Sequence, residues 1–328
     1  MDIELHSPLL GSKVNIWSDF LAKAGLAADN DAAQTVLVWE EEQLIATGSR
    51  TGNLLKCIAV DPARQGEGLL AKVLTTLRQE AFREGYQHLF LYTKPGNGAL
   101  FSDLLFYPVA QTGDALLMED RKDGISGFLR QLPVQGNGGR IGAVVMNCDP
   151  FTLGHQYLIE TAAKDCDHLY VFVLSEDKGR FSAADRLEMV CRGTAQLPNV
   201  TVLSTGPYLI SGATFPTYFL KNRDRAEQIH CQLDVEIFAR HFVPTFSISA
   251  RYVGTEPLSG LTNQYNEVLK TQLPKWGIEV VEIPRRTIEN TPISASAVRN
   301  ALKNGELQTV QTLVPSTTLM YLTEKHLI

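Results

Sequence analysis

The length, composition and charge of the chain exclude several classes of protein. Its 328 residues are enough for two domains, and 44% hydrophobic with 20% charged residues is ordinary for a globular protein rather than for a disordered or fibrous one. A formal net charge of −6 offers no broad basic surface for nucleic acid, and no apolar run is long enough to span a bilayer. We therefore expect neither nucleic acid nor a membrane as a partner.

The amino terminus and the cysteines favour the cytoplasm. The opening residues, MDIELHSPLL, carry acids where a secretory signal would carry bases. The five cysteines are scattered and show no C-x-x-C spacing, which argues for reduced thiols and against a disulfide framework or a zinc site. We expect a cytoplasmic protein without a metal site made by its own side chains.

The first 125 residues combine short strands with a glycine-rich helix start. Apolar runs typical of strands occupy residues 35–40, 44–48, 54–60, 88–93 and 115–119. Helical spacing runs over residues 69–77 and again over about 99–105. The segment Gln65-Gly66-Glu67-Gly68 stands directly before the first of these helices. This mixture predicts an α/β domain.

The order of these elements, together with the segment V-D-P-x-x-Q-G-x-G, resembles the GCN5-related N-acetyltransferase fold. In that family, backbone amides of the loop hold the pyrophosphate of coenzyme A. The resemblance implies that Gln65, Gly66 and Gly68 contact a CoA-like arm. Leu70 stands where the family has a small residue, and Leu105 stands where it has glycine. From the residues alone, a plain turn before a helix is the alternative.

A polar, glycine-containing segment separates the two halves of the chain. Residues 126–139 end in Gln-Gly-Asn-Gly-Gly, which is typical of a flexible connection. We expect an acetyltransferase-like first domain over residues 1–125, a linker over 126–139 and a nucleotide-binding second domain over 140–328.

The second half alternates apolar runs with helical spacing, starting from a buried strand at 141–146. Pro150 ends that strand, and Thr152, Gly154 and His155 open a helix. Further strands are expected at residues 168–174, 200–204, 249–254 and 279–283. Such alternation predicts a doubly wound parallel sheet, and ligands of these sheets bind at the carboxyl ends of the strands.

Two helix starts in this half are suited to phosphate. A strand that turns tightly into a helix at Thr152 directs free backbone N–H groups at one point. Farther along, Ser294 and Ser296 stand at another helix start and Arg299 lies one turn inside it, which adds a cation to a second anion-binding terminus. Lys178 is a further candidate for compensating phosphate charge, with a solvent-facing lysine as the alternative.

These motifs resemble the T/H-x-G-H and I-S-x-S/T-x-x-R signatures of the nucleotidylyltransferase superfamily. The stretches N-C-D-P-F-T-L-G-H, S-E-D-K-x-x-F-S-x-x-D-R and R-Y-V-G-T-E-P narrow the resemblance to the citrate lyase ligase family, which joins an acetyltransferase-like half to a nucleotidylyltransferase-like half. The resemblance implies His155 and Thr152 as catalytic groups, aided by Lys178. It also implies a nucleotide-binding set of residues: Asn147, Gly154, Gly254, Ser294, Ser296 and Arg299.

The family resemblance implies a reaction as well. Members use ATP and acetate to acetylate the thiol of the phosphoribosyl-dephospho-CoA group on the acyl-carrier subunit of citrate lyase, through acetyl-adenylate, and release AMP and pyrophosphate. Mg²⁺ is expected to accompany ATP through the phosphate oxygens. Acetate is ionised at neutral pH, so its attack on the α-phosphate needs no general base.

Other classes of function are open at the level of the residues. A plain adenylyltransferase would use a phosphate ester such as phosphopantetheine as its nucleophile and would share the same phosphate-binding motifs. An amine N-acetyltransferase with a nucleotide-sensing second half would bind acetyl-CoA without cleaving ATP. A non-catalytic protein that only docks the carrier is the least favoured class, because the motifs at Thr152 and Ser294 would then serve no chemistry.

Overall fold

The structure, a computed structural model, describes residues 1–135, 138–177, 179–210, 215–220, 225–255, 260–288 and 291–328. The chain folds into two compact units. The first contains Met1–Gly124 together with Pro216–Ile229, and the second contains Ile125–Phe215 together with His230–Ile328. This division differs from the expected one, because a segment of the carboxyl half belongs to the first unit.

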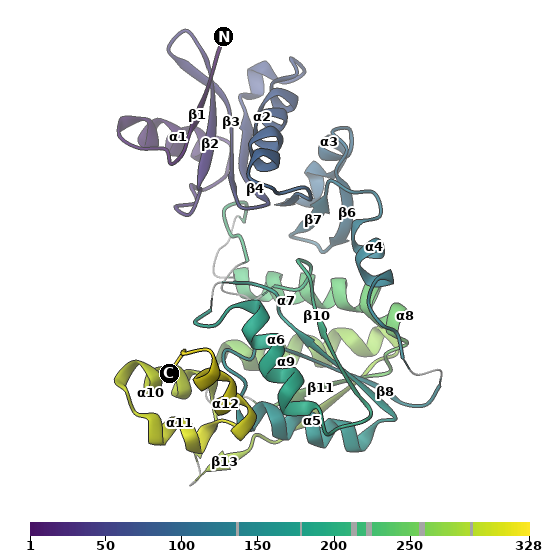
Figure 1. The fold of residues 1–328 in the computed structure, drawn as a ribbon. Helices are drawn as coiled ribbons and strands as arrows, with labels where there is room; N and C mark the ends of the chain where they lie inside the picture. The colour runs from purple at the N-terminus through teal and green to yellow at the C-terminus, as the bar shows by residue number, and fades with distance from the viewer. Residues whose placement is uncertain (136–137, 178, 211–214, 221–224, 256–259, 289–290) are drawn as a thin grey trace. The chain divides into compact units, whose positions relative to one another are not determined.

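The first unit is built around a seven-stranded sheet with the strand order β1-β2-β3-β4-β5-β7-β6. Its strands are β1 (Asp2–His6), β2 (Gln34–Glu40), β3 (Gln43–Thr51), β4 (Leu54–Val60), β5 (Phe90–Thr93), β6 (Tyr107–Gln111) and β7 (Leu116–Glu119). Its helices are α1 (Ser12–Lys23), α2 (Leu69–Arg83) and the short α3 (Gly98–Ser102) (Figure 1). The mixed α/β fold predicted for the first half is therefore confirmed.

Helix α2 covers the sheet because its apolar residues recur at helical spacing. Val73 and Leu77 are fully buried, and a side-chain carbon added at Gly48 of β3 would lie 2.5 Å from Val73. Gly68 caps the helix in the left-handed conformation with φ 74°, which glycine adopts without steric cost. The glycine-rich loop thus turns the chain into α2.

Strands β4 and β5 run side by side only at Leu54 and Leu55 of β4 and then part. The buried ring of Tyr218 lies beside β5, where its hydroxyl donates a 2.6 Å hydrogen bond to the carbonyl of Tyr92. The backbone N–H of Ala27 donates to the carbonyl of Tyr218 at 2.8 Å. These bonds pair polar groups of the first unit with residues 216–229, which explains why that segment belongs to it.

The second unit is a five-stranded parallel sheet with the order β10-β9-β8-β11-β12. Its strands are β8 (Ile141–Met146), β9 (His168–Val173), β10 (Val200–Ser204), β11 (Ala250–Gly254) and β12 (Glu279–Ile283). Its principal helices are α5 (Leu153–Asp165), α6 (Ala183–Thr194), α7 (Ala226–Ile237, whose first turn belongs to the first unit), α8 (Val243–Phe246), α9 (Gly260–Gln272), α10 (Ala295–Asn304), α11 (Leu307–Leu313) and α12 (Ser316–Glu324). The predicted doubly wound parallel sheet is confirmed.

The two faces of this sheet have separate cores. On one face, Val144 and Met146 of β8 pack in a cluster with Ile159 of α5. On the other face, the ring of Phe172 of β9 meets Phe242 edge to face, with ring centroids 5.2 Å apart. Burial of both faces explains why the strands read as continuous apolar runs rather than as alternating ones.

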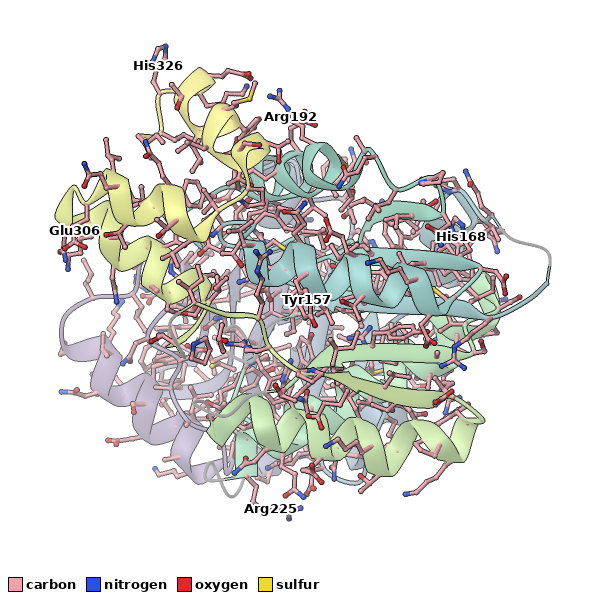
Figure 2. All side chains as sticks on the ribbon, turned by 90° about the horizontal axis from the view of Figure 1, so that it is seen from below. Tyr157, His168, Arg192, Arg225, Glu306 and His326 are labelled. Atoms are coloured by element: carbon pink, nitrogen blue, oxygen red, sulfur yellow. The ribbon has the colours of Figure 1, made fainter. Side chains whose placement is uncertain are left out.

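Ion pairs also join helices at the surface of the second unit. Arg192 of α6 donates to Glu324 of α12 at 2.7 Å, and its guanidinium lies over the ring of Tyr321, 4.8 Å from the centroid. Figure 2 shows Arg192 beside these carboxyl-terminal helices. Such exposed pairs add little stability singly, so we attribute the packing of α12 mainly to its buried apolar residues.

Several elements differ from the expected ones. Strands β1 and β6 and helix α1 were not predicted, because their apolar residues are few or interrupted. The expected linker begins with helix α4 (Gly124–Arg130), which buries Ile125 and Leu129, so this part is not a flexible connection. Within the described residues, no helix is both long and apolar enough to cross a membrane.

Leu105 generates a prediction about stability. It adopts a left-handed backbone with φ 63° at the position where the acetyltransferase resemblance has glycine, and its side chain is 62% exposed. Because that conformation costs a leucine about 1–2 kcal/mol, Leu105→Gly should raise the free energy of unfolding by about 1 kcal/mol in denaturant titrations. The control Leu100→Gly, at an exposed helical position in α3, should lower it by a similar amount. Equal loss of stability in both variants would contradict the strain at Leu105.

Candidate functional site

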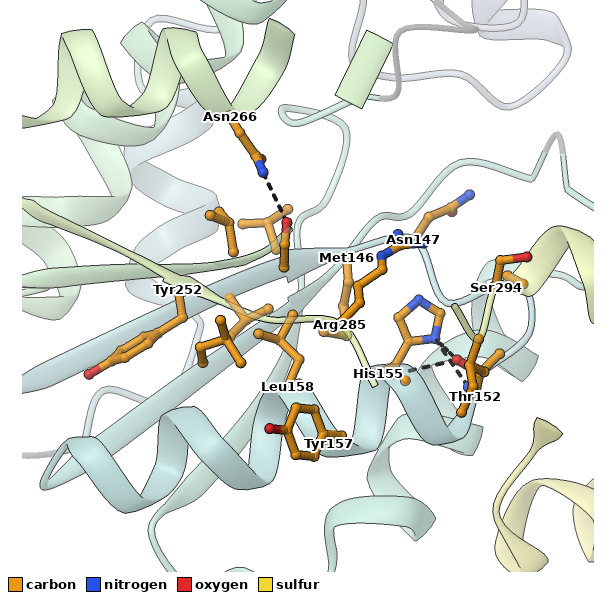
Figure 3. Close-up of a pocket in the computed structure, with 18 of the residues that line it drawn as sticks. Met146, Asn147, Thr152, His155, Tyr157, Leu158, Tyr252, Asn266, Arg285 and Ser294 are labelled. Atoms are coloured by element: carbon orange, nitrogen blue, oxygen red, sulfur yellow. Dashed lines mark hydrogen bonds between the residues drawn. The ribbon is translucent and has the colours of Figure 1, made fainter. Parts of the chain in front are cut away.

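The candidate site is a pocket at the carboxyl ends of β8 and β11. These strands pair at Ala250 with Gly142 and at Arg251 with Ala143, and then they separate. The strand order reverses at this point, since β9 and β10 lie on one side of β8 and β12 lies beyond β11. A pocket of about 330 Å³ opens between the separated strands (Figure 3). Ligands of doubly wound sheets bind at such a switch point.

Thr152 and His155 form a reciprocal cap at the start of α5. The Thr152 hydroxyl oxygen accepts a 3.3 Å hydrogen bond from the His155 backbone N–H, and the Thr152 backbone N–H donates to Nδ1 of His155 at 3.1 Å. The Thr152 Oγ1 also lies 3.0 Å from that Nδ1. Because Nδ1 accepts, the neutral imidazole carries its proton on Nε2. The cap therefore sets the tautomer as well as the orientation of the ring.

His155 is held neutral by its surroundings. Burial, reinforced by the positive charge of Arg285, lowers the pKa of His155 from its ordinary value to about 4. Figure 3 shows the imidazole and the Arg285 side chain in the same pocket. At neutral pH the ring is thus an uncharged hydrogen-bond donor through Nε2, rather than a cation or a general acid.

Gly154 lets two helix starts come together. A side-chain carbon added there would lie 3.2 Å from the carbonyl oxygen of Ile293, which precedes α10. Ser294 follows and caps α10, since its hydroxyl accepts a 3.1 Å hydrogen bond from the backbone N–H of Ala297. Gly154 and Ser294 both line the pocket. Two helix N-termini consequently face one cavity, an arrangement that attracts anions.

Arg299 ties the start of α10 to the loop after β8. It donates to the Asp149 carbonyl at 2.5 Å and to the Ser296 hydroxyl at 3.0 Å. Its guanidinium also lies 3.6 Å from the Asp149 carboxylate. Ser296 and Arg299 therefore lie beside the pocket but are not among the residues that line it.

Asp149 and Arg186 hold the loops around the pocket. The buried Asp149 carboxylate accepts hydrogen bonds from the backbone N–H groups of Arg180 at 3.1 Å and Phe181 at 3.0 Å. The fully buried Arg186 donates to the Asn147 carbonyl at 2.8 Å and also to the Glu176 carbonyl. Neither residue has a predicted role, although Asp149 belongs to the motif N-C-D-P and Arg186 to the motif S-x-x-D-R.

The opposite wall comes from β11, α9 and the segment after β12. Asn266 donates to the carbonyl of Gly254 at 2.9 Å, and both residues line the pocket (Figure 3). Arg285 lines it as well, with its backbone N–H bonded to the Thr255 hydroxyl at 3.0 Å. Local sequence patterns assign no role to Arg285, whereas the structure places it in the pocket that His155 also lines.

Apart from Ser296 and Arg299, which lie beside the pocket, the predicted residues divide into three groups. Around the pocket lie Asn147, Thr152, Gly154, His155, Gly254 and Ser294. Lys178 lies outside the described residues. In the first unit, Gln65 lines a separate pocket of about 250 Å³, while Gly66 and Gly68 adopt positive φ values of 86° and 74° in the loop before α2.

The fold defines a class: an α/β protein in which one unit is built on a seven-stranded mixed sheet and the other on a five-stranded parallel sheet with a pocket at its switch point. Comparison with known proteins narrows the class. A family model described as the citrate lyase ligase C-terminal domain matches residues 141–322.

Curated relatives match almost the whole chain. The [citrate [pro-3S]-lyase] ligase of Klebsiella pneumoniae is 43% identical over 92% of this chain and 90% of its own length. The protein of the same name from Escherichia coli K12 is 38% identical over 93% of this chain and 89% of its own. The crystal structure of Escherichia coli ElaA matches 37% of this chain and 100% of its own at 14% identity, with a TM-score of 0.32. The chain belongs to the citrate lyase ligase family, and it is an enzyme of the acid–thiol ligase type.

The low pKa of His155 predicts its titration. In the folded protein the ring should titrate near pH 4, which NMR of the imidazole carbons can follow, with His155→Ala to assign the signal. Because unfolding returns the pKa to about 6.5, the unfolded state binds the proton first and stability should fall as the pH drops from about 6.5 to 4. Above pH 7 this contribution should be constant. A midpoint near 6.5 in the folded protein would contradict the neutral donor.

Proposed function

We propose that this enzyme acetylates the thiol of the phosphoribosyl-dephospho-CoA group on the acyl-carrier subunit of citrate lyase. It uses ATP and acetate, forms acetyl-adenylate in the pocket between β8 and β11, and releases AMP and pyrophosphate. Two observations support this proposal: the family membership over nearly the whole chain, and a pocket where two helix starts and a neutral histidine donor face the same cavity.

The first step needs positioning and charge compensation. An acetate oxygen attacks the α-phosphorus, the bond from that phosphorus to the β-phosphate oxygen breaks, and the electron pair leaves with pyrophosphate. The Nε2–H of His155 donates to the α-phosphate, with Thr152 holding the ring. Ser294 and Arg285 compensate charge from the other walls. No proton has to be removed from acetate at neutral pH.

Groups near the mouth of the pocket compensate the charge of the remaining phosphates. Ser296 and Arg299 bind the β- and γ-phosphates in this proposal, with Lys178 as a further cation. Mg²⁺ would accompany ATP and would supply further charge neutralisation at the phosphates.

The second step uses the thiol of the carrier's prosthetic group. The thiolate attacks the carbonyl carbon of acetyl-adenylate, the bond to the phosphate oxygen breaks, and AMP leaves with that electron pair. A cysteine of this chain is not required. Cys148, beside the pocket, is buried, and burial raises its pKa far above the ordinary value, so it is a poor nucleophile.

The first unit binds the prosthetic arm in this proposal. Its pocket lies where β4 and β5 have parted and is lined by Gln65, Thr93, Asn97 and Tyr218 among others. Separated strand edges leave backbone groups that can hydrogen-bond the amides of a pantetheine arm. The start of α2 beyond Gly68 supplies N–H groups for its phosphates.

One observation also favours the plain adenylyltransferase. A phosphorylated nucleophile needs cations close to Thr152, and Arg285 lines the same pocket. The amine N-acetyltransferase would instead require acetyl-CoA in the first unit and no cleavage of ATP. Exchange of labelled pyrophosphate into ATP, without carrier protein, separates the three functions. Acetate supports the exchange if the enzyme is the proposed ligase, and a phosphopantetheine compound supports it if the enzyme is an adenylyltransferase. Neither compound supports the exchange if the enzyme is an amine N-acetyltransferase.

We expect acetate-dependent pyrophosphate exchange in the wild-type enzyme and its loss in a histidine variant. His155→Ala removes a donor aimed at the α-phosphate, so exchange should slow by about 10²–10³-fold. The control His6→Ala, in β1 of the other unit, should leave it unchanged. Exchange that needs phosphopantetheine rather than acetate would replace this proposal with the adenylyltransferase.

A second prediction tests the arm site. Gln65 is exposed at the rim of the first-unit pocket, and Gln65→Trp should narrow that pocket without disturbing the core. The KM for the carrier protein should rise by about tenfold, because a bulky rim residue blocks entry, while carrier-free exchange should stay unchanged. The control Glu67→Trp changes an exposed residue of the same loop that does not line the pocket. Equal effects of both variants, or loss of exchange, would contradict arm binding there.

A further inference from the structure

Arg251 is a buried charge at the floor of the crevice. It belongs to β11, forms the last register pair with β8 before the strands separate, and lines the pocket. Only 3% of its surface is exposed. A cation in the middle of an apolar strand is costly to bury unless something compensates its charge.

The neighbours of Arg251 do not use its donors fully. Among the described residues, its Nε and Nη1 atoms have no hydrogen-bond partner. One side of the guanidinium is covered by the ring of Phe238, 4.6 Å from the centroid. Tyr265 hydrogen-bonds the guanidinium, and Asp234 interacts with it electrostatically. The Asp234 carboxylate accepts a 2.5 Å hydrogen bond from Tyr265, and burial raises the pKa of Asp234. Arg251 therefore retains donors for an anion.

The position of Arg251 separates that anion from the phosphates. The helix starts at Thr152 and Ser294 stand beyond the strand ends, whereas Arg251 lies three residues before the end of β11. Alternation along β11 places Val253 on the same face as Arg251, and Val253 also lines the pocket. A small anion with an apolar body fits a charged floor beside apolar walls better than a triphosphate does.

We propose that Arg251 binds the carboxylate of the acyl substrate. This inference rests on the proposed carboxylate adenylation and identifies where its nucleophile is held. One carboxylate oxygen bonds to the guanidinium, and the other is directed toward the strand ends, where it attacks the α-phosphorus of ATP. The bond between that phosphorus and the departing oxygen breaks as described above, and the guanidinium undergoes no chemical change.

The experiment compares Arg251→Met with Arg186→Met. Both arginines are buried, but Arg186 donates to the Asn147 and Glu176 carbonyls, whereas Arg251 retains unpartnered donors. Arg251→Met should raise the melting temperature because a poorly compensated charge is removed, and Arg186→Met should lower it because buried carbonyls lose their donor.

Substrate dependence supplies the functional readout. In the pyrophosphate exchange assay, Arg251→Met should raise the KM for acetate by about 10- to 150-fold. This is the loss of affinity expected when one charge-assisted hydrogen bond is removed. The dissociation constant for ATP, measured by calorimetry without acetate, should not change. Arg251→Lys keeps the charge and should recover part of the acetate affinity.

Two results would overturn the inference, and a third separates it from the proposed function. If Arg251→Met lowers the melting temperature and weakens ATP and acetate binding in parallel, Arg251 has a structural role only. If Arg251→Met leaves the KM for acetate unchanged, Arg251 does not contact the substrate. If the wild type shows no acetate-dependent exchange, the proposed function fails. Sodium acetate, at matched ionic strength, would then still support the site if it raises the melting temperature of the wild type but not of Arg251→Met.

Discussion

The separation of β8 from β11 after Arg251 is the constraint on which the second unit depends. Beyond the last shared pair, β8 is paired only with β9 and β11 only with β12, so the backbone groups on the two edges that face each other require loops, helix ends or a ligand. Helices α5 and α10 begin at this opening, and Gly154 allows them to approach each other. Asp149 and Arg186 then hold the surrounding loops by hydrogen bonds to backbone groups. Polar contacts thus fix the loops around the crevice.

The pocket is rich in donors. His155 presents a neutral N–H, Ser294 caps a helix, and Arg285 adds charge. The low pKa keeps His155 uncharged at neutral pH, which avoids the repulsion that a protonated imidazole would feel from Arg285. For the proposed reaction, whose nucleophile is already ionised and whose co-substrate is a polyanion, orientation and charge compensation contribute more than proton removal.

The local part of the site could be predicted from the sequence, and the distant part could not. The strand at 141–146, the turn at Pro150 and the helix start at Thr152 are contiguous, so the spacing of these residues is enough to predict this part of the site. The bond from Arg299 to the Asp149 carbonyl joins residues 150 positions apart, and no local pattern reveals it. For Arg251 the sequence contains one local indication of a special role, because a charged residue stands inside an apolar strand. The allocation of residues 216–229 to the first unit depends on hydrogen bonds that form only after folding.

Chain continuity connects the two pockets. Tyr218 and Phe219 line the pocket of the first unit, and the same stretch of chain leads into α7, which carries Asp234. Asp234 accepts the hydrogen bond of Tyr265, and Tyr265 lines the pocket of the second unit. Tyr218 and Phe219 thus form part of the wall that a group in the first pocket would face. In the proposed function, this stretch of chain is the covalent route through which arm binding in the first unit would act on adenylate formation in the second.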